Sequence, residues 1–85
     1  MTKLKKYTPQ MKKLAIAIRT QRKKLKLTQK QLGDYAGCGV AFIYLLESGK
    51  TSVRMDKVCD VLTILGLQLK LEIGKELIVI DSRLE

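Results

Sequence analysis

The residues that could do chemistry in this sequence are mainly cationic, and they gather at one end. Residues 1–33 hold eleven Lys or Arg and no acidic residue, and the first acid is Asp34. Residues 34–85 hold six basic and eight acidic residues, so the formal charge of +9 arises in the first 33 positions. Such asymmetry favours a polyanionic ligand, namely DNA, RNA or an anionic membrane surface. A solvated lysine-rich tail is the alternative for residues 1–6.

The side chains needed for catalysis or for metal binding are scarce. The sequence has no histidine, which removes a common zinc ligand and the usual general base at neutral pH. Cys38 and Cys59 do not form a CxxC pair, and neither a Walker-type phosphate loop nor a nucleophile elbow occurs. We therefore predict a binding protein with reduced cysteines, no cofactor, no metal and no enzymatic activity.

The apolar segments are too short for a membrane protein. No stretch reaches the roughly 18 apolar residues of a membrane span, and no apolar region follows the N-terminal lysines as in a secretory signal. A basic amphipathic helix can also lie on a membrane surface, but the apolar stripe of residues 9–25 is better explained as core. We predict a cytoplasmic, nucleoid-associated protein with no membrane partner.

Two helices are predicted in the basic part of the chain. The first runs from Pro9 to about Leu25, with Thr8 as its N-cap. Its inward stripe is expected to consist of Met11, Leu14, Ala15, Ile18, Arg22 and Leu25. The second begins at Thr28, where Thr28 and Gln31 have the spacing of a capping box, and it ends near residues 36–37.

Two further helices and a hairpin complete the predicted order. One helix covers residues 40–48, with Ile43 and Leu46 inward. The next is capped by Ser52 or Thr51 and ends at residue 66. Its inward positions are expected to be Met55, Val58, Leu62 and Leu65. Residues 67–73 then alternate as a strand does, and Gly74-Lys75 could form a type II′ turn into a second strand over 76–81.

The predicted hairpin has one wholly apolar face. Its register pairs Leu71 with Ile78 and Leu69 with Ile80. Because an isolated two-stranded hairpin is marginally stable in water, we predict a homodimer held partly by this segment. The predicted dimerisation residues are Leu67, Leu69, Leu71, Ile73, Ile78 and Ile80. The alternative is that the hairpin folds back on its own helices.

Several short motifs resemble the Cro/C1-type (XRE) helix-turn-helix family. They are Leu27-Thr28-Gln29, Ala36-Gly37, Ile43, Leu46-Glu47 and Gly49-Lys50. Residues 37–69, GCGVAFIYLLESGKTSVRMDKVCDVLTILGLQL, are similar to HipB-like (Y4mF-type) antitoxins. The resemblance implies a mainly α, four-helix, λ-repressor-like domain, with a C-terminal β-strand or hairpin that pairs across a dimer. The expected organisation is a basic arm over 1–8, the helix-turn-helix domain over 9–66 and a dimerisation segment with a tail over 67–85.

The same resemblance implies a function. It implies an antitoxin of a type II toxin–antitoxin system that binds double-stranded operator DNA as a dimer and represses its own operon. The partner would be a HipA-type serine/threonine kinase toxin, in one chain or split between chains. A stand-alone regulator of this fold and a protein-only kinase inhibitor or adaptor with weak DNA binding are the alternatives.

The resemblance also implies roles for individual residues. It puts Gln29 on a DNA phosphate, and a helix N-terminus favours an anion there. The predicted contacts to the flanking DNA backbone are Lys30, Lys50, Arg54, Arg19 and Lys23. Arg22 and Glu47 correspond to an internal ion pair of phage repressors, which we interpret as structural.

The helix over residues 40–48 departs from the phage members of the family. The positions expected to meet the major groove are Gly39, Val40, Ala41, Tyr44 and Leu45. The last four are polar in phage members, so direct hydrogen-bonded readout is expected to be limited. The remaining means of recognising DNA are apolar contact with thymine methyl groups, the tyrosine hydroxyl and the shape of the DNA. Alternatively, Phe42 and its neighbours contact a protein partner, or Phe42 is core.

Overall fold

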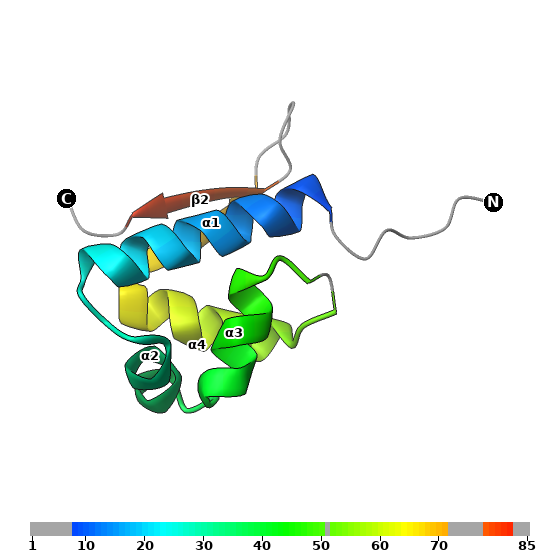
Figure 1. Ribbon diagram of the computed structural model, residues 1–85. Coiled ribbons are helices and arrows are strands. Elements are labelled where there is room, and N and C mark those ends of the chain that lie inside the picture. The colour runs from blue at the N-terminus through cyan, green and yellow to red at the C-terminus, as the bar shows by residue number, and fades with distance from the viewer. Residues whose placement is uncertain (1–7, 51, 72–77, 83–85) are drawn as a thin grey trace.

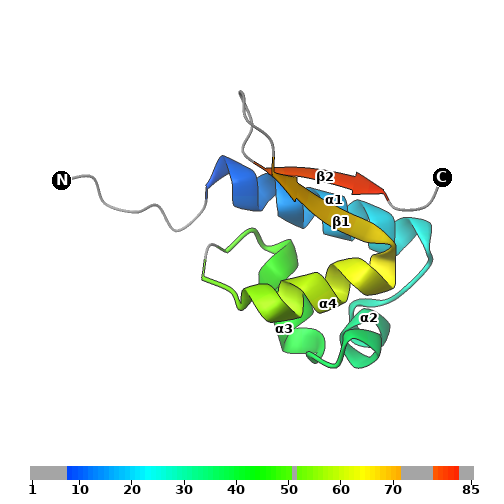
Figure 2. The ribbon, with the colours of Figure 1, turned by 180° about the vertical axis from the view of Figure 1, so that it is seen from behind.

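The computed structural model describes residues 8–50, 52–71 and 78–82. Its elements are, in chain order, α1 (Pro9–Lys24), α2 (Gln29–Ala36), α3 (Val40–Glu47), α4 (Met55–Leu65), β1 (Leu67–Leu71) and β2 (Ile78–Ser82). The hairpin lies along α1 on one side of the molecule, and α2 and α3 lie on the other (Figures 1 and 2). This confirms the predicted mainly α architecture of four helices followed by a short β segment. No helix among the described residues is long and apolar enough to cross a bilayer.

The first two helices begin where their capping residues predict. The Thr8 hydroxyl accepts a hydrogen bond from the Met11 N–H at 3.2 Å. At α2 the capping box is complete, because the Gln31 N–H donates to the Thr28 hydroxyl at 3.0 Å and the Thr28 N–H donates to the Gln31 side chain at 2.8 Å. These bonds satisfy N–H groups that have no partner within the helix.

The start of α4 differs from the prediction. The helix begins at Met55 after an extended N-cap at Arg54, and no side chain caps it, so the predicted cap at Ser52 is wrong. The other predicted cap, Thr51, lies outside the described residues. Val53 packs against the core, which keeps the chain extended before the helix can begin. Met55, predicted to face inward, is 56% exposed in the first turn.

The core is aliphatic and draws on every described helix and on β1. Its members are Leu14, Ile18, Leu32, Ala36, Ile43, Leu46, Val58, Val61, Leu62, Leu65 and Leu67. The inward stripe predicted for α1 is confirmed at Leu14, Ala15, Ile18 and Arg22. Leu25, also predicted inward, is 41% exposed because α1 ends at Lys24 and Leu25 is its C-cap.

The corner between α2 and α3 depends on an unusually close backbone approach. The Gly33 carbonyl accepts the N–H groups of Cys38 at 3.0 Å and Gly39 at 3.1 Å. A Cβ atom on Gly33 would lie 2.5 Å from the carbonyl carbon of Gly39, so a side chain does not fit there without movement. Gly37 ends α2 in the predicted left-handed conformation, with φ of 71°. These contacts fix α3 against α2.

The hairpin has the predicted register, and it packs on its own helices. Leu69 pairs with Ile80 and Leu71 with Ile78 in an antiparallel arrangement. Leu67 is buried, and Leu69 packs against the core cluster, with β1 next to α4 and β2 next to α1. For these two side chains the structure therefore agrees with the alternative prediction, in which the hairpin folds back on its own helices. Ile73, the turn at 74–75 and residues 1–7 of the predicted arm lie outside the described residues.

Candidate nucleic-acid interface

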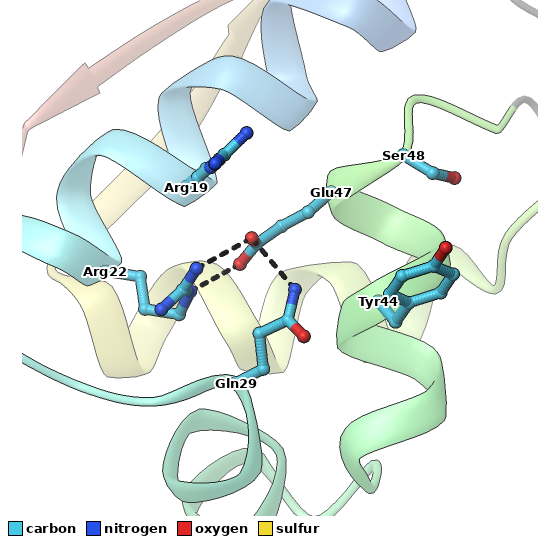
Figure 3. Close-up of a pocket in the computed structure, with 6 residues that line it drawn as sticks. All are labelled: Arg19, Arg22, Gln29, Tyr44, Glu47 and Ser48. Carbon is cyan, nitrogen blue, oxygen red and sulfur yellow. Dashed lines mark hydrogen bonds and ion pairs between the residues drawn. The ribbon is translucent and has the colours of Figure 1, made fainter.

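A buried ion pair links α1 to both helices of the helix-turn-helix. The Arg22 Nε donates to Glu47 Oε2 at 2.6 Å, and Arg22 Nη2 donates to Glu47 Oε1 at 3.0 Å (Figure 3). The third guanidinium nitrogen, Nη1, donates to the Leu27 carbonyl at 2.8 Å. Arg22 thus ties α1 both to the end of α3 and to the segment that leads into α2. The side chains of Arg22 and Glu47 are only 10% and 5% exposed, which fits the predicted structural ion pair.

The Arg22 guanidinium is favoured in its charged form by its partner. The hydrogen bond to Glu47 raises the pKa of the Arg22 guanidinium, and this effect exceeds the opposing effect of burial. Bidentate Arg–carboxylate geometry is strong and directional. The pair therefore fixes the position of α3 relative to α1, and we assign it no catalytic role.

Gln29 is held by the same pair. Its Nε2 donates to Glu47 Oε1 at 3.2 Å, so the first residue of α2 is anchored to the last residue of α3 (Figure 3). A side-chain amide carries two N–H donors, so one remains for another acceptor. Gln29 also lines an open pocket of about 310 Å³ with Arg19, Tyr44 and Ser48. The N-terminus of α2 opens on this side, which gives a place for a phosphate group.

The cationic residues predicted to contact the DNA backbone differ in their exposure and in their partners. Arg19 lines the pocket, and Lys23 is exposed one turn later on α1. Lys30 is exposed and pairs with Asp34 at 2.9 Å. Lys50 is half-buried after α3. Exposed pairs are weak, so Lys30 can exchange its carboxylate partner for a phosphate.

Arg54 has a similar exposed partner. Its Nη2 lies 2.7 Å from Asp56 Oδ2, and both side chains are more than half exposed. The hydrogen bond from Arg54 lowers the pKa of the Asp56 carboxyl, so the carboxylate stays charged to a more acidic pH than an ordinary aspartate does. For the predicted contact with DNA, Arg54 must either release Asp56 or bind Asp56 and a phosphate with the same guanidinium.

The outward face of α3 is apolar and uncovered. Val40, Tyr44 and Leu45 are 47%, 64% and 38% exposed. Ala41 and the N-cap residue Gly39 are exposed as well. By contrast, Ile43 and Leu46 are fully buried, as predicted. Phe42 is half-buried against the core. All five positions predicted to meet the major groove are therefore accessible to solvent.

Sequence reasoning missed three contributors to this site. Ser48 lines the pocket one turn after Tyr44, and helical spacing could have indicated it. The Leu27 carbonyl and Gly33 act through the backbone, and side-chain patterns carry no signal for such contacts.

The two predicted dimerisation residues with described side chains, Leu67 and Leu69, lie on the α1 and α4 side of the domain. The described residues contain no group of His, Cys, Asp or Glu that could hold a metal.

Comparison with known proteins agrees with this geometry. A family model described as helix-turn-helix matches residues 18–71. An uncharacterized HTH-type transcriptional regulator, y4mF, from Sinorhizobium fredii is 43% identical over 49 residues, which are 58% of this chain and 64% of that protein. The chain thus spans slightly less than two thirds of that relative's length. Because the family model covers more than half of the chain and its helix pair has the geometry described above, the chain belongs to the Cro/C1-type helix-turn-helix family.

Proposed function

We propose that this protein is a DNA-binding transcriptional regulator that places α3 in the major groove of double-stranded operator DNA. The observation that carries the proposal is the fixed α2–α3 pair, in which Gln29 and the N-terminus of α2 open beside Arg19. A helix-turn-helix uses its second helix for base contacts and its first helix to cross the backbone. Phosphate contacts of this kind supply most of the non-specific affinity. The proposed activity is binding, without catalysis, and its site of action is the nucleoid in the cytoplasm.

A mobility-shift assay with the DNA upstream of its own gene tests this proposal. We expect Gln29→Ala and Lys50→Ala each to weaken binding, because each removes a proposed phosphate contact. Lys13→Ala is the charge-matched control for Lys50→Ala, since Lys13 is exposed on α1 and outside the proposed contact set. Equal loss in all three variants, or no shifted band for the unaltered protein at low salt, would contradict the proposal.

We also propose that the active form is a homodimer. The described sheet has two strands, so each strand has one edge without a strand partner within residues 67–71 and 78–82. Such edges can pair with a second copy, and a twofold dimer matches the two half-sites of an operator. Sedimentation at micromolar concentration tests this directly, and a monomer across that range would refute it.

The finer proposal is that the regulator is the antitoxin of a HipA-type kinase toxin. It is supported by the resemblance of residues 37–69 to HipB-like antitoxins. The name of the Sinorhizobium fredii relative gives only transcriptional regulation, which suits a stand-alone regulator equally. Co-expression with a kinase-like neighbouring gene product distinguishes them, because an antitoxin co-purifies with that product and relieves its toxicity.

A protein-only inhibitor is the remaining candidate, favoured by the exposed apolar residues of α3. It differs from both regulators in the mobility-shift assay, where it would give no specific complex.

A further inference from the structure

The outward side of α3 poses a chemical problem for base recognition. In its exposed part, Val40, Ala41 and Leu45 offer no hydrogen-bond donor or acceptor in their side chains. The Ser48 hydroxyl is already used, because it donates to the Leu45 carbonyl within the same helix. The Ser48 oxygen can still accept, so the Tyr44 hydroxyl is the one side-chain hydrogen-bond donor that this surface offers to a base without breaking a described bond (Figure 3).

The surroundings of this surface favour DNA over a protein partner. The pocket beside α3 contains Arg19, and Lys23 follows it on α1 with no acidic neighbour in residues 1–33. The one acid in the pocket, Glu47, is 5% exposed and neutralised by Arg22. An apolar surface with cationic side chains on its α1 side is complementary to a groove that has apolar groups on its floor and phosphates along its rim.

The apolar group on the floor of the major groove is the 5-methyl of thymine. We infer that α3 selects its DNA site mainly through thymine methyl groups, with Ala41 and Leu45 as the principal contacts and Val40 beside them. This inference rests on the proposed DNA binding and specifies what the site recognises. Ala41 and Leu45 are one turn apart, about 6 Å along the helix at about 1.5 Å per residue. That distance is close to two base steps at about 3.4 Å each, so the pair can reach two thymines on nearby steps.

Replacing thymine by uracil removes this methyl group and leaves every hydrogen-bonding group of the base unchanged. A duplex library with a random core longer than two helical turns is amplified once with dTTP and once with dUTP, and each pool is selected on the full-length protein. The best thymine sequence is then made in both forms for titration by fluorescence anisotropy. We expect the uracil form to bind about fourfold more weakly per buried methyl, the equivalent of about 0.8 kcal/mol.

Protein variants locate the contact. Leu45→Ala should weaken binding to the thymine duplex severalfold. The variant should then bind the thymine and uracil duplexes with similar affinity, because the substitution and the base change remove the same contact. Ile64→Ala is the matched control, since Ile64 is 39% exposed on α4 and Leu45 is 38% exposed on α3. Thermal melting checks that both variants fold.

The outcomes separate this inference from the proposed function. A preference for thymine that is reduced by Leu45→Ala and retained by Ile64→Ala supports methyl recognition. Equal affinity for the thymine and uracil duplexes overturns methyl recognition and leaves DNA binding intact. Failure to bind either library at low salt overturns both.

Discussion

Breaking the Arg22–Glu47 pair should destabilise the domain more than any surface substitution. Arg22→Met removes two bonds to Glu47 and one to the Leu27 carbonyl, and leaves a carboxylate whose side chain is 5% exposed with Gln29 as its remaining described partner. Loss of one member of a buried pair costs about 3–5 kcal/mol. A small domain has only about 5–15 kcal/mol of stability in total. We therefore expect Arg22→Met or Glu47→Leu to lower the melting temperature by more than about 12 °C, at about 4–8 °C per kcal/mol.

The double variant gives the decisive comparison. Because Arg22→Met with Glu47→Leu leaves no isolated buried charge, it should be more stable than either single variant by at least about 2 kcal/mol. Urea unfolding followed by circular dichroism measures all four proteins. Additive losses, with coupling below about 0.5 kcal/mol, would refute the interpretation of Arg22 and Glu47 as a coupled buried pair.

Three further tests address the local structure. Thr28→Ala should cost about 1 kcal/mol in urea unfolding, because it removes the acceptor of the Gln31 N–H; a change within error would contradict the capping box. Gly33→Ala should cost about 1–3 kcal/mol by overpacking, whereas Gly37→Asn, at a position with φ of 71° and open space, should cost much less. Burial raises the pKa of the Cys38 thiol, so less thiolate is present at a given pH. In a Cys59→Ser background its alkylation should therefore rise only above the pH range of an ordinary cysteine, and a normal profile would contradict this.

Sequence patterns predicted the elements whose ends carry a local chemical signal. The Thr28 and Gln31 capping box predicted the start of α2. The alternation after Gly66 predicted the first strand, and the predicted two-residue turn at 74–75 fixed the register of the hairpin. Local patterns failed where tertiary packing decided the backbone. Val53 packs on the core, and α4 begins only after it, at Met55. The residues around Ser52 carry no local capping signal for this packing.

The candidate site was predictable to a similar extent. The Arg22–Glu47 pair came from resemblance together with the inward position of a charged residue, and its geometry is confirmed. That Gln29 would be anchored by the same carboxylate was not foreseen, because residues 18 positions apart meet only once α2 and α3 are packed. The homodimer and the toxin partner stay predictions. The packing of Leu67 on its own helices shows that the hairpin can satisfy part of its apolar face within one chain.

The salt dependence of DNA binding tests the central claim most directly. Anisotropy titrations with the duplex upstream of its own gene, repeated from low to physiological salt, give the slope of log K against log salt. The slope has a magnitude near 0.9 for each neutralised phosphate. A dimer that places the cations beside Gln29 and those of the flanking segments on two half-sites should therefore give a slope with a magnitude above about 4. A slope well below that value, or no binding at low salt, would contradict the account.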